Sequence, residues 1–147
     1  MIRVLLVEDS ETDAAMTIYR MSRSARKNGR GVQIHHVETG KECMEHLRDP
    51  DVPFPDIIFL DLNMPEMDGR EVLGEMKADG ELHQITTVIM SSSALESDRA
   101  KAMALGANSY IVKPANEEEF GETMELVDRY WLATNVFPPK RQKKRRS

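Results

Sequence analysis

Five short apolar runs, separated by longer amphipathic segments, set the hydrophobic pattern of this chain. The runs lie near residues 2–7, 32–38, 56–61, 86–91 and 108–112. Apolar runs of this length are typical of strands buried on both faces of a sheet, and their alternation with helical segments is typical of parallel α/β folds. The pattern therefore predicts an α/β fold with a doubly wound, five-stranded parallel sheet and helices on both faces.

Helix-start signals support this division. Ser10 and Thr39 each stand three residues before an acidic side chain, Asp13 and Glu42 respectively, which is the spacing of a capping box. Asn116 is followed directly by three glutamates, which combine a helix cap with charges that suit a helix N-terminus. We therefore expect helices to begin just after the first, second and fifth apolar runs.

Three carboxylates stand where strands of the predicted sheet end. Asp61 closes the run 56–61, and Glu8 and Asp9 follow the run 2–7. Because ligands of open α/β sheets bind just outside the carboxyl ends of the strands, we expect these side chains to converge at one edge. Like charges about 4 Å apart repel by roughly 1 kcal/mol in water and more inside a protein, and a cation removes that cost. Mg²⁺ prefers such oxygen ligands, so the sequence predicts a magnesium site.

Two further polar side chains end predicted strands. Lys113 follows the run 108–112, and its ammonium group is able to pair with a phosphoryl oxygen. Ser91 closes the run 86–91 and offers a hydroxyl to the same oxygens. Carboxylates, a metal site, an ammonium group and a hydroxyl at one sheet edge indicate phosphoryl chemistry, with Asp61 as the candidate acceptor.

At these residues the chain resembles the receiver domains of two-component response regulators. The resemblance spans roughly residues 2–132 and rests on motifs that occur in the family's order: Glu8-Asp9, Leu60-Asp61-Leu62-Asn63-Met64-Pro65, Ser91, Leu105-Gly106-Ala107-Asn108-Ser109-Tyr110 and Lys113-Pro114. It implies a flavodoxin-like fold with strand order 2-1-3-4-5. It also implies a phosphoacceptor signalling protein rather than an enzyme, one that assists its own phosphorylation and slow dephosphorylation.

The resemblance implies three groups of site residues, namely a phosphoacceptor with its lysine, the ligands of Mg²⁺, and a pair of switch residues. The phosphoacceptor is Asp61 and the lysine Lys113; the metal ligands are Glu8, Asp9, Asp61 and the backbone carbonyl of Asn63; the switch residues are Ser91 and Tyr110. After phosphorylation Ser91 is expected to move toward the phosphoryl group and Tyr110 to fill the vacated space. The peptide bond between Lys113 and Pro114 is expected to be cis, which X–Pro bonds allow.

A closer resemblance is to the small regulators that are paired with bacterial phytochromes and related sensor kinases. It rests on the stretch 9–14, the run of three serines at 91–93 and the ending Tyr130-Trp131-Leu132. Ser91 stands where this family usually has threonine, so the hydroxyl is kept and a methyl group is lost. The resemblance implies a sensor histidine kinase as partner, a histidine phosphotransfer protein as a further one, and a homodimer formed by helix 4, strand 5, helix 5 and the C-terminal extension.

Charge divides the chain into two parts. Residues 140–147 carry six of the twenty Lys and Arg, so the remainder has fourteen against 25 Asp and Glu, a formal charge of −11. We expect a receiver domain over 1–132 and a C-terminal extension over 133–147, with an apolar arm at 133–139 and a basic, disordered tail at 140–147. A basic tail is also able to contact nucleic acid, an anionic membrane or an acidic protein surface. Because no helix-turn-helix segment accompanies it, we expect no direct DNA binding.

Length and composition set outer limits. The 147 residues contain no apolar stretch near 18 residues and no signal-like start, so we expect one cytoplasmic domain without a membrane segment. The single Cys43 lies in an amphipathic segment and is expected to be part of the core.

Two other classes of protein fit part of the pattern. A metal-dependent phosphatase or phosphotransferase also uses an aspartate after a strand but usually needs a second aspartate two residues later, where Asn63 stands here. A pseudo-receiver that binds partners without phosphorylation typically lacks an acidic residue or the lysine, and this chain has Glu8, Asp9, Asp61 and Lys113. The residues therefore favour a phosphoacceptor.

Overall fold

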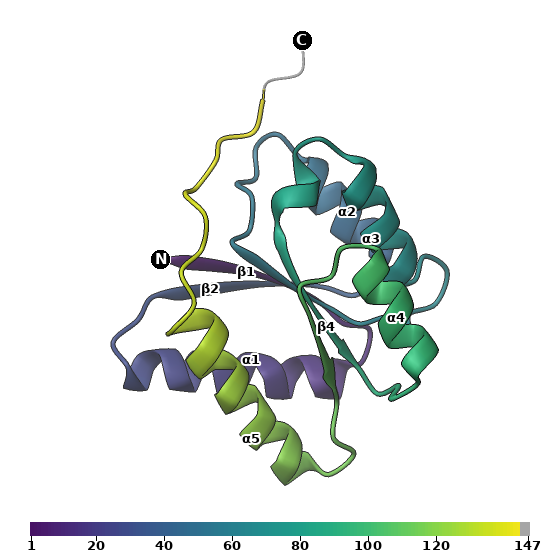
Figure 1. The fold of residues 1–147 in the computed structure, drawn as a ribbon. Coiled ribbons are helices and arrows are strands. Elements are labelled where there is room, and N and C mark those ends of the chain that lie inside the picture. Colours follow the sequence, from purple (N-terminus) through teal and green to yellow (C-terminus); the bar gives the residue numbers. More distant parts are fainter. Residues whose placement is uncertain (145–147) are drawn as a thin grey trace.

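A parallel sheet in the order β2-β1-β3-β4-β5 forms the centre of the computed structural model, which describes residues 1–144 (Figure 1). This confirms the predicted doubly wound sheet and its strand order. Each strand end lies within one residue of its predicted position, as is usual for element boundaries. The strands are β1 (Ile2–Val7), β2 (Val32–Val37), β3 (Ile57–Leu60), β4 (Thr86–Ser91) and β5 (Ser109–Val112).

Helices cover both faces of the sheet, with α1 and α5 on one face and α2, α3 and α4 on the other (Figure 1). Each face closes over its own group of buried apolar side chains. Within residues 1–144, no helix is long and apolar enough to span a membrane. The helices are α1 (Glu11–Lys27), α2 (Gly40–Arg48), α3 (Gly69–Ala78), α4 (Glu96–Ala104) and α5 (Glu117–Val127), with a 3₁₀ turn η1 (Leu82–Gln84) and a π-helical turn η2 (Asp128–Leu132).

The predicted helix caps are confirmed. The Ser10 hydroxyl accepts a hydrogen bond from the backbone N–H of Asp13, and the Thr39 hydroxyl accepts one from that of Glu42. The Asn116 side chain accepts from backbone N–H groups in the first turn of α5. These caps satisfy N–H groups that have no partner within the helix. Because each cap stands close behind a strand, it fixes where the chain turns at the functional edge of the sheet.

The central strands of the sheet are buried from solvent. All four residues of β3 are fully buried, and β1 is buried from Val4 onward. Alternate side chains of these strands enter the two apolar clusters on opposite faces, for example Leu5 and Leu6. Cys43 is fully buried in the cluster under α2, as predicted. A fully buried strand therefore carries Asp61 to the edge of the sheet.

The segment after α5 turns back along its own domain. Leu132 is buried, and Trp131 packs partly buried against the cluster between the sheet, α1 and α5. Tyr130 meets the Trp131 ring edge-on at a centroid distance of 5.0 Å and is 53% exposed. Trp131 is therefore covered in part by its own domain, whereas Tyr130 remains on the surface.

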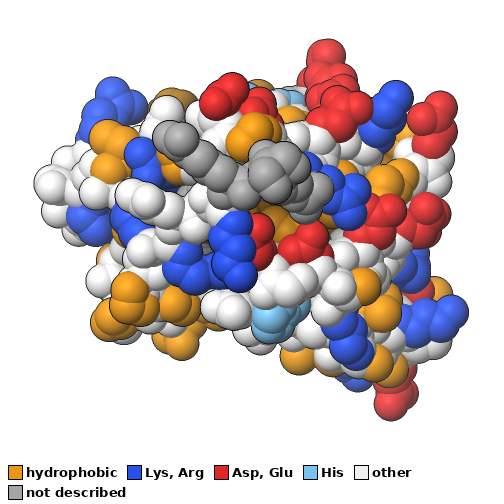
Figure 2. Space-filling model, turned by 90° about the horizontal axis from the view of Figure 1, so that it is seen from above, with side chains coloured by type: hydrophobic (Ala, Val, Ile, Leu, Met, Phe, Trp, Pro, Cys, Tyr) orange, Lys and Arg blue, Asp and Glu red, His pale blue; other side chains and the backbone are white. Residues whose placement is uncertain are grey.

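Residues 140–144 lie against the domain at the edge of the sheet where β1 begins (Figure 1). The Lys140 ammonium group binds the Met1 carbonyl oxygen at 2.6 Å, and that of Lys143 binds the Asp49 carbonyl oxygen at 2.7 Å, just beyond the end of α2. Figure 2 shows basic and acidic side chains interspersed on this face. The sequence did not predict these contacts, and the last part of the predicted disordered tail, 145–147, lies outside the described residues.

Candidate functional site

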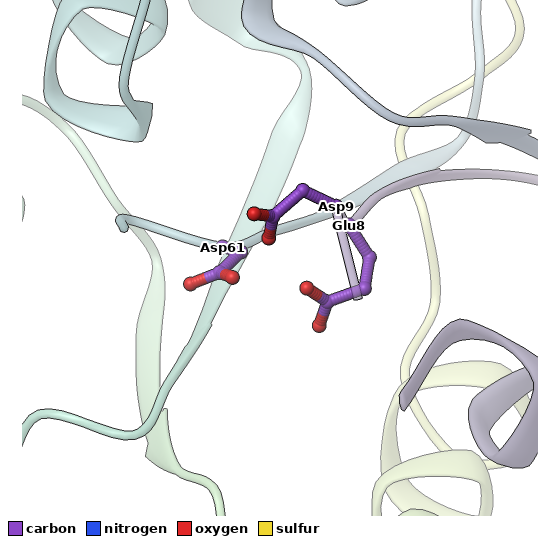
Figure 3. A group of neighbouring side chains, drawn as sticks. All are labelled: Glu8, Asp9 and Asp61. Atoms are coloured by element: carbon purple, nitrogen blue, oxygen red, sulfur yellow. The ribbon is translucent and has the colours of Figure 1, made fainter. Parts of the chain in front are cut away.

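Three carboxylates meet at the edge of the sheet where the parallel strands end. One oxygen of each of Glu8, Asp9 and Asp61 lies within 4.8 Å of the others, and Figure 3 shows the three groups facing one another. The register of β1 with β3 pairs Val7 with Leu60, so the residues that follow these strands are neighbours. Glu8 and Asp61 are buried, whereas Asp9 is exposed. The predicted convergence is therefore present in the structure.

Lys113 brings a positive charge into this acidic group. Its Nζ atom lies 3.6 Å from Asp61 Oδ2 and 3.1 Å from Asp13 Oδ2, and it forms an ion pair with Glu8. Burial by itself would lower the Lys113 pKa, but the hydrogen bond with Glu8 and the charges of Asp61 and Glu8 raise it above its ordinary value. The ammonium group therefore stays charged beside Asp61.

Glu8 holds its proton more tightly than an ordinary carboxylic acid. Burial is the main cause and, with the nearby Asp61 carboxylate, outweighs the hydrogen bond from Lys113, raising the Glu8 pKa to about 7. The raised pKa shows that the buried pocket, which already holds the Asp61 carboxylate, disfavours a further negative charge on Glu8. A divalent cation with a preference for oxygen ligands would offset that charge, so the donor set fits Mg²⁺.

Asn63 links the acidic pocket to Ser91. Its backbone N–H donates to Asp61 Oδ1 at 3.1 Å, and its side-chain Nδ2 donates to Ser91 Oγ at 3.2 Å. Ser91 itself is fully buried at the end of β4. The sequence pointed only to the backbone carbonyl of Asn63 and did not predict the role of its side-chain amide.

Tyr110 lies partly buried on β5 and packs against the apolar cluster beneath α3 and α4. Its hydroxyl donates to the carbonyl oxygen of Ser93 at 2.9 Å. The Tyr110 side chain therefore contacts the loop that follows Ser91. The movement of Ser91 and Tyr110 after phosphorylation stays a prediction.

The loop after β3 approaches the start of α3 very closely. The Gly69 N–H donates to the Leu62 carbonyl oxygen at 3.0 Å. A Cβ atom at Gly69 would clash with the carbonyl oxygen of Asp61 and lie 2.9 Å from the Cα of Leu62. Only glycine therefore lets the first turn of α3 lie against the backbone of Asp61.

One expectation about this edge is wrong. The Lys113–Pro114 peptide bond, expected to be cis, is trans in the structure. The trans form is favoured by about 0.5–1 kcal/mol for X–Pro bonds, and Lys113 reaches the acidic pocket with it.

Sequence reasoning also missed several residues around the pocket. Asp13 contacts Lys113 from the first turn of α1, where its position four residues after Asp9 was an available signal. His36 Nε2 lies 2.8 Å from the Glu8 carbonyl oxygen and joins β2 to the backbone of the pocket. Arg70 and Asp98 form an ion pair between α3 and α4, and no local sequence pattern indicates that these two residues meet.

The chain matches the family model of the response regulator receiver domain over residues 4–125. It is 30% identical over 139 residues to response regulator Rcp1 of Synechocystis sp., covering 92% of each chain. It is 31% identical over 138 residues to the probable methanogenesis regulatory protein FilR2 of Methanothrix harundinacea, covering 92% of this chain and 86% of that protein. These relatives therefore match nearly along their whole length.

Solved structures show the same likeness. The Mn²⁺-bound form of Rcp1 superposes with a TM-score of 0.88 at 29% identity, covering 95% of this chain and all of that one. The phosphorylated cyanobacterial phytochrome response regulator RcpA superposes with a TM-score of 0.87 at 33% identity, covering 94% and 99%. With the flavodoxin-like sheet and the acidic pocket at its edge, these matches establish that the chain belongs to the response regulator receiver family and is a response regulator of two-component signalling.

Proposed function

We propose that Asp61 accepts a phosphoryl group from a phosphohistidine of a sensor histidine kinase. The observation that carries the proposal is the position of the Asp61 carboxylate, 7% exposed and 3.6 Å from the Lys113 ammonium group within a cluster of acidic oxygens. A carboxylate oxygen in this place is a nucleophile with a cation beside it. The chain belongs to a family of signalling proteins, so we expect it to act in signalling and not to turn over a substrate.

In this reaction an Asp61 oxygen attacks the phosphorus atom, and the bond between phosphorus and the histidine nitrogen breaks, leaving its electron pair on the imidazole. Lys113 pairs with the transferring oxygens, and the hydroxyl of Ser91 donates to one of them. Glu8, Asp9, Asp61 and the Asn63 carbonyl oxygen would hold Mg²⁺, which supplies charge neutralisation on the phosphoryl oxygens when bound. Rcp1, a relative of this chain, has been solved in a Mn²⁺-bound form, which supports this use of the pocket.

The phosphorylated state would be lost by hydrolysis at the same site. Asn63 is exposed beside the buried Asp61, so water has a path to the acyl phosphate. We propose that the chain thus assists both its own phosphorylation and its slow dephosphorylation.

The new charge of about −1.5 to −2 would act on the surface formed by α4, β5 and α5. The Ser91 hydroxyl and the Tyr110 ring would transmit the change to this surface. Exposed apolar side chains gather on these elements and η2, and we propose that they form a homodimer interface: Leu95, Met103, Val112, Leu126 and Tyr130. A histidine phosphotransfer protein would use the same surface or the phosphorylation site.

We further propose that the kinase partner is a phytochrome-type sensor and that the chain acts in the cytoplasm. RcpA is described as a cyanobacterial phytochrome response regulator, and RtBRR, 30% identical with a TM-score of 0.69, as a bacteriophytochrome response regulator. We also propose a receiver domain over 1–132 with an extension over 133–147; the family match over residues 4–125 lies within that receiver domain.

The deciding experiment is incubation of the chain with acetyl phosphate and Mg²⁺, followed by phosphate-affinity electrophoresis. We expect a magnesium-dependent shifted band that is absent in Asp61→Asn. A panel of phosphorylated sensor kinases, phytochrome-type kinases included, provides a second donor. Labelling that persists in Asp61→Asn would refute the assignment of Asp61 as the acceptor. Absence of labelling with both donors would favour a pseudo-receiver that binds partners without phosphorylation.

A further inference from the structure

Hydrogen bonds run without a break from the Asp61 carboxylate to the first turn of α4. Asn63 joins Asp61 to the Ser91 hydroxyl, and the backbone N–H of Ser93 donates to the same Ser91 oxygen at 3.2 Å. The Ser91 oxygen thus accepts two hydrogen bonds, which occupy both of its lone pairs. Its proton is the group that remains to be donated to a phosphoryl oxygen on Asp61.

Ser93 is the junction of these bonds. Its carbonyl oxygen accepts from the Tyr110 hydroxyl, and its own hydroxyl donates to Asp98 Oδ2 at 2.6 Å. The backbone of Ser93 therefore contacts the two proposed switch residues, while its side chain is anchored on α4. The orientation of the Ser93 N–H toward Ser91 depends on that anchor.

Arg70 holds the anchor from the neighbouring helix. Its Nη2 atom donates to Asp98 Oδ1 at 2.5 Å, and its Nη1 atom lies 3.6 Å from Asp68 Oδ2 at the cap of α3. The preceding residue, Gly69, packs directly against the backbone of Asp61. The contacts thus form a closed ring that begins and ends at Asp61 and passes through α3 and α4.

We propose that Arg70 and Asp98 are positioning residues for phosphoryl binding at Asp61, an inference that rests on the proposed function. Their ion pair holds Ser93, and through it the Ser91 hydroxyl, in the orientation that donates to the phosphoryl group. The coupling is reciprocal, so a phosphoryl group on Asp61 strengthens the contact between α3 and α4.

The exposure of the pair separates this role from a purely structural one. The Arg70 and Asp98 side chains are 24% and 18% exposed, so solvent screens the pair in part, and its loss should cost less stability than the loss of a fully buried pair. Hydrogen bonds from Ser93 and Arg70 lower the Asp98 pKa, so the carboxylate stays ionised at neutral pH. Removing the pair should therefore leave the domain folded and change mainly what happens at Ser91.

The test uses the full chain and beryllofluoride, which stands in for a phosphoryl group on a carboxylate. Its affinity at saturating Mg²⁺ is measured by calorimetry for the wild type, Asp98→Asn, Arg70→Gln and the double variant. We expect each to bind about fivefold to twentyfold more weakly, within the range usual for coupled sites, and the double variant to match the single ones. Ser93→Ala should lose as much, and Ser93→Thr, which keeps the hydroxyl, should lose little.

The matched control is Arg48→Gln, which removes an exposed ion pair of Arg48 with Glu75 between α2 and α3, 3.2 Å long and outside the ring. It should not change beryllofluoride affinity. Affinity for Mg²⁺ alone should stay at the wild-type value in every variant, because the acidic pocket is not altered. The urea midpoint is measured for every variant as well and should fall only slightly, because the pair is partly solvated.

Each outcome decides the matter. Wild-type beryllofluoride affinity in Asp98→Asn and Arg70→Gln would overturn the proposal, and so would a parallel loss of Mg²⁺ affinity and stability, which is the mark of a structural role. Failure of the wild type itself to bind beryllofluoride any better than Asp61→Asn would count against the proposed function instead.

Discussion

Replacing Arg30 by methionine should destabilise the fold, because it leaves the Asp128 carboxylate buried without a cation. Asp128 begins η2, is fully buried, and accepts hydrogen bonds from the Ser24 hydroxyl and from Arg30 Nη2, the latter at 2.7 Å. Its other oxygen has no hydrogen-bond partner within residues 1–144. The pair therefore ties the C-terminal end of α5 to α1 and to the turn before β2, across 98 residues of sequence.

The expected magnitude follows from this burial. Removing one partner of a buried ion pair costs about 3–5 kcal/mol, and because the Arg30 side chain is 19% exposed we expect the lower end, about 3 kcal/mol. With a urea dependence of about 2 kcal/mol per M, the midpoint should fall by about 1.5 M. Asp128→Asn keeps the shape and the contact with Ser24, so about half that loss is expected. The double variant Arg30→Met/Asp128→Leu should recover to within about 1 kcal/mol of the wild type, since apolar pairs often replace buried ion pairs at little cost.

Urea unfolding followed by circular dichroism measures all four proteins, with Arg26→Met on the exposed face of α1 as the control for loss of an arginine. The control should stay within about 0.5 kcal/mol of the wild type. A loss below about 1 kcal/mol in Arg30→Met, or a double variant no more stable than the single one, would show that the pair is not a buried structural contact.

Four further predictions follow from the structure. Gly69→Ala should destabilise the fold by about 2 kcal/mol or more, because the new Cβ atom would clash with backbone atoms. Gly121→Ala would meet only a flexible arginine side chain and should be neutral or stabilising by up to about 1 kcal/mol. Equal losses of stability in the same urea assay would contradict this prediction. Lys143→Ser should cost about 0.5 kcal/mol, less at high salt, by removing a cation from the end of α2; a loss that salt does not alter would argue against the charge effect. Burial raises the Cys43 pKa to about 12, so a thiol reagent at pH 8 should react only when urea unfolds the chain, and rapid native labelling would exclude this burial. Burial also raises the Glu8 pKa from 4.5 to about 7, so the metal-free fold should lose stability as the pH rises from 4.5 to 7. Mg²⁺ affinity, measured by calorimetry, should rise about tenfold from pH 6 to pH 8 as Glu8 loses its proton. An unchanged affinity would refute the assignment of Glu8 as a metal ligand.

The sequence by itself determined the architecture and the position of the acidic pocket. Apolar runs and helix caps are local signals, and the structure has the five strands and the predicted caps in place. Parallel strands end at the same edge of the sheet, and the strand order implied by the family resemblance places β1, β3, β4 and β5 next to one another, so the residues after these strands were expected to meet there. For this reason Glu8, Asp9, Asp61 and Lys113 could be grouped without knowledge of a single distance.

The tertiary structure alone decided which side chains far apart in the sequence meet, both beside that pocket and elsewhere in the fold. The contacts of Lys113 with Asp13, of Ser24 with Asp128 and of Lys140 with Met1 join residues 100, 104 and 139 positions apart. No periodicity or motif records such pairs, because they depend on how the helices pack against the sheet. The ring through Arg70 and Asp98 has the same origin: each residue is an ordinary charged position on its own helix, and only the packing of α3 beside α4 brings the two together.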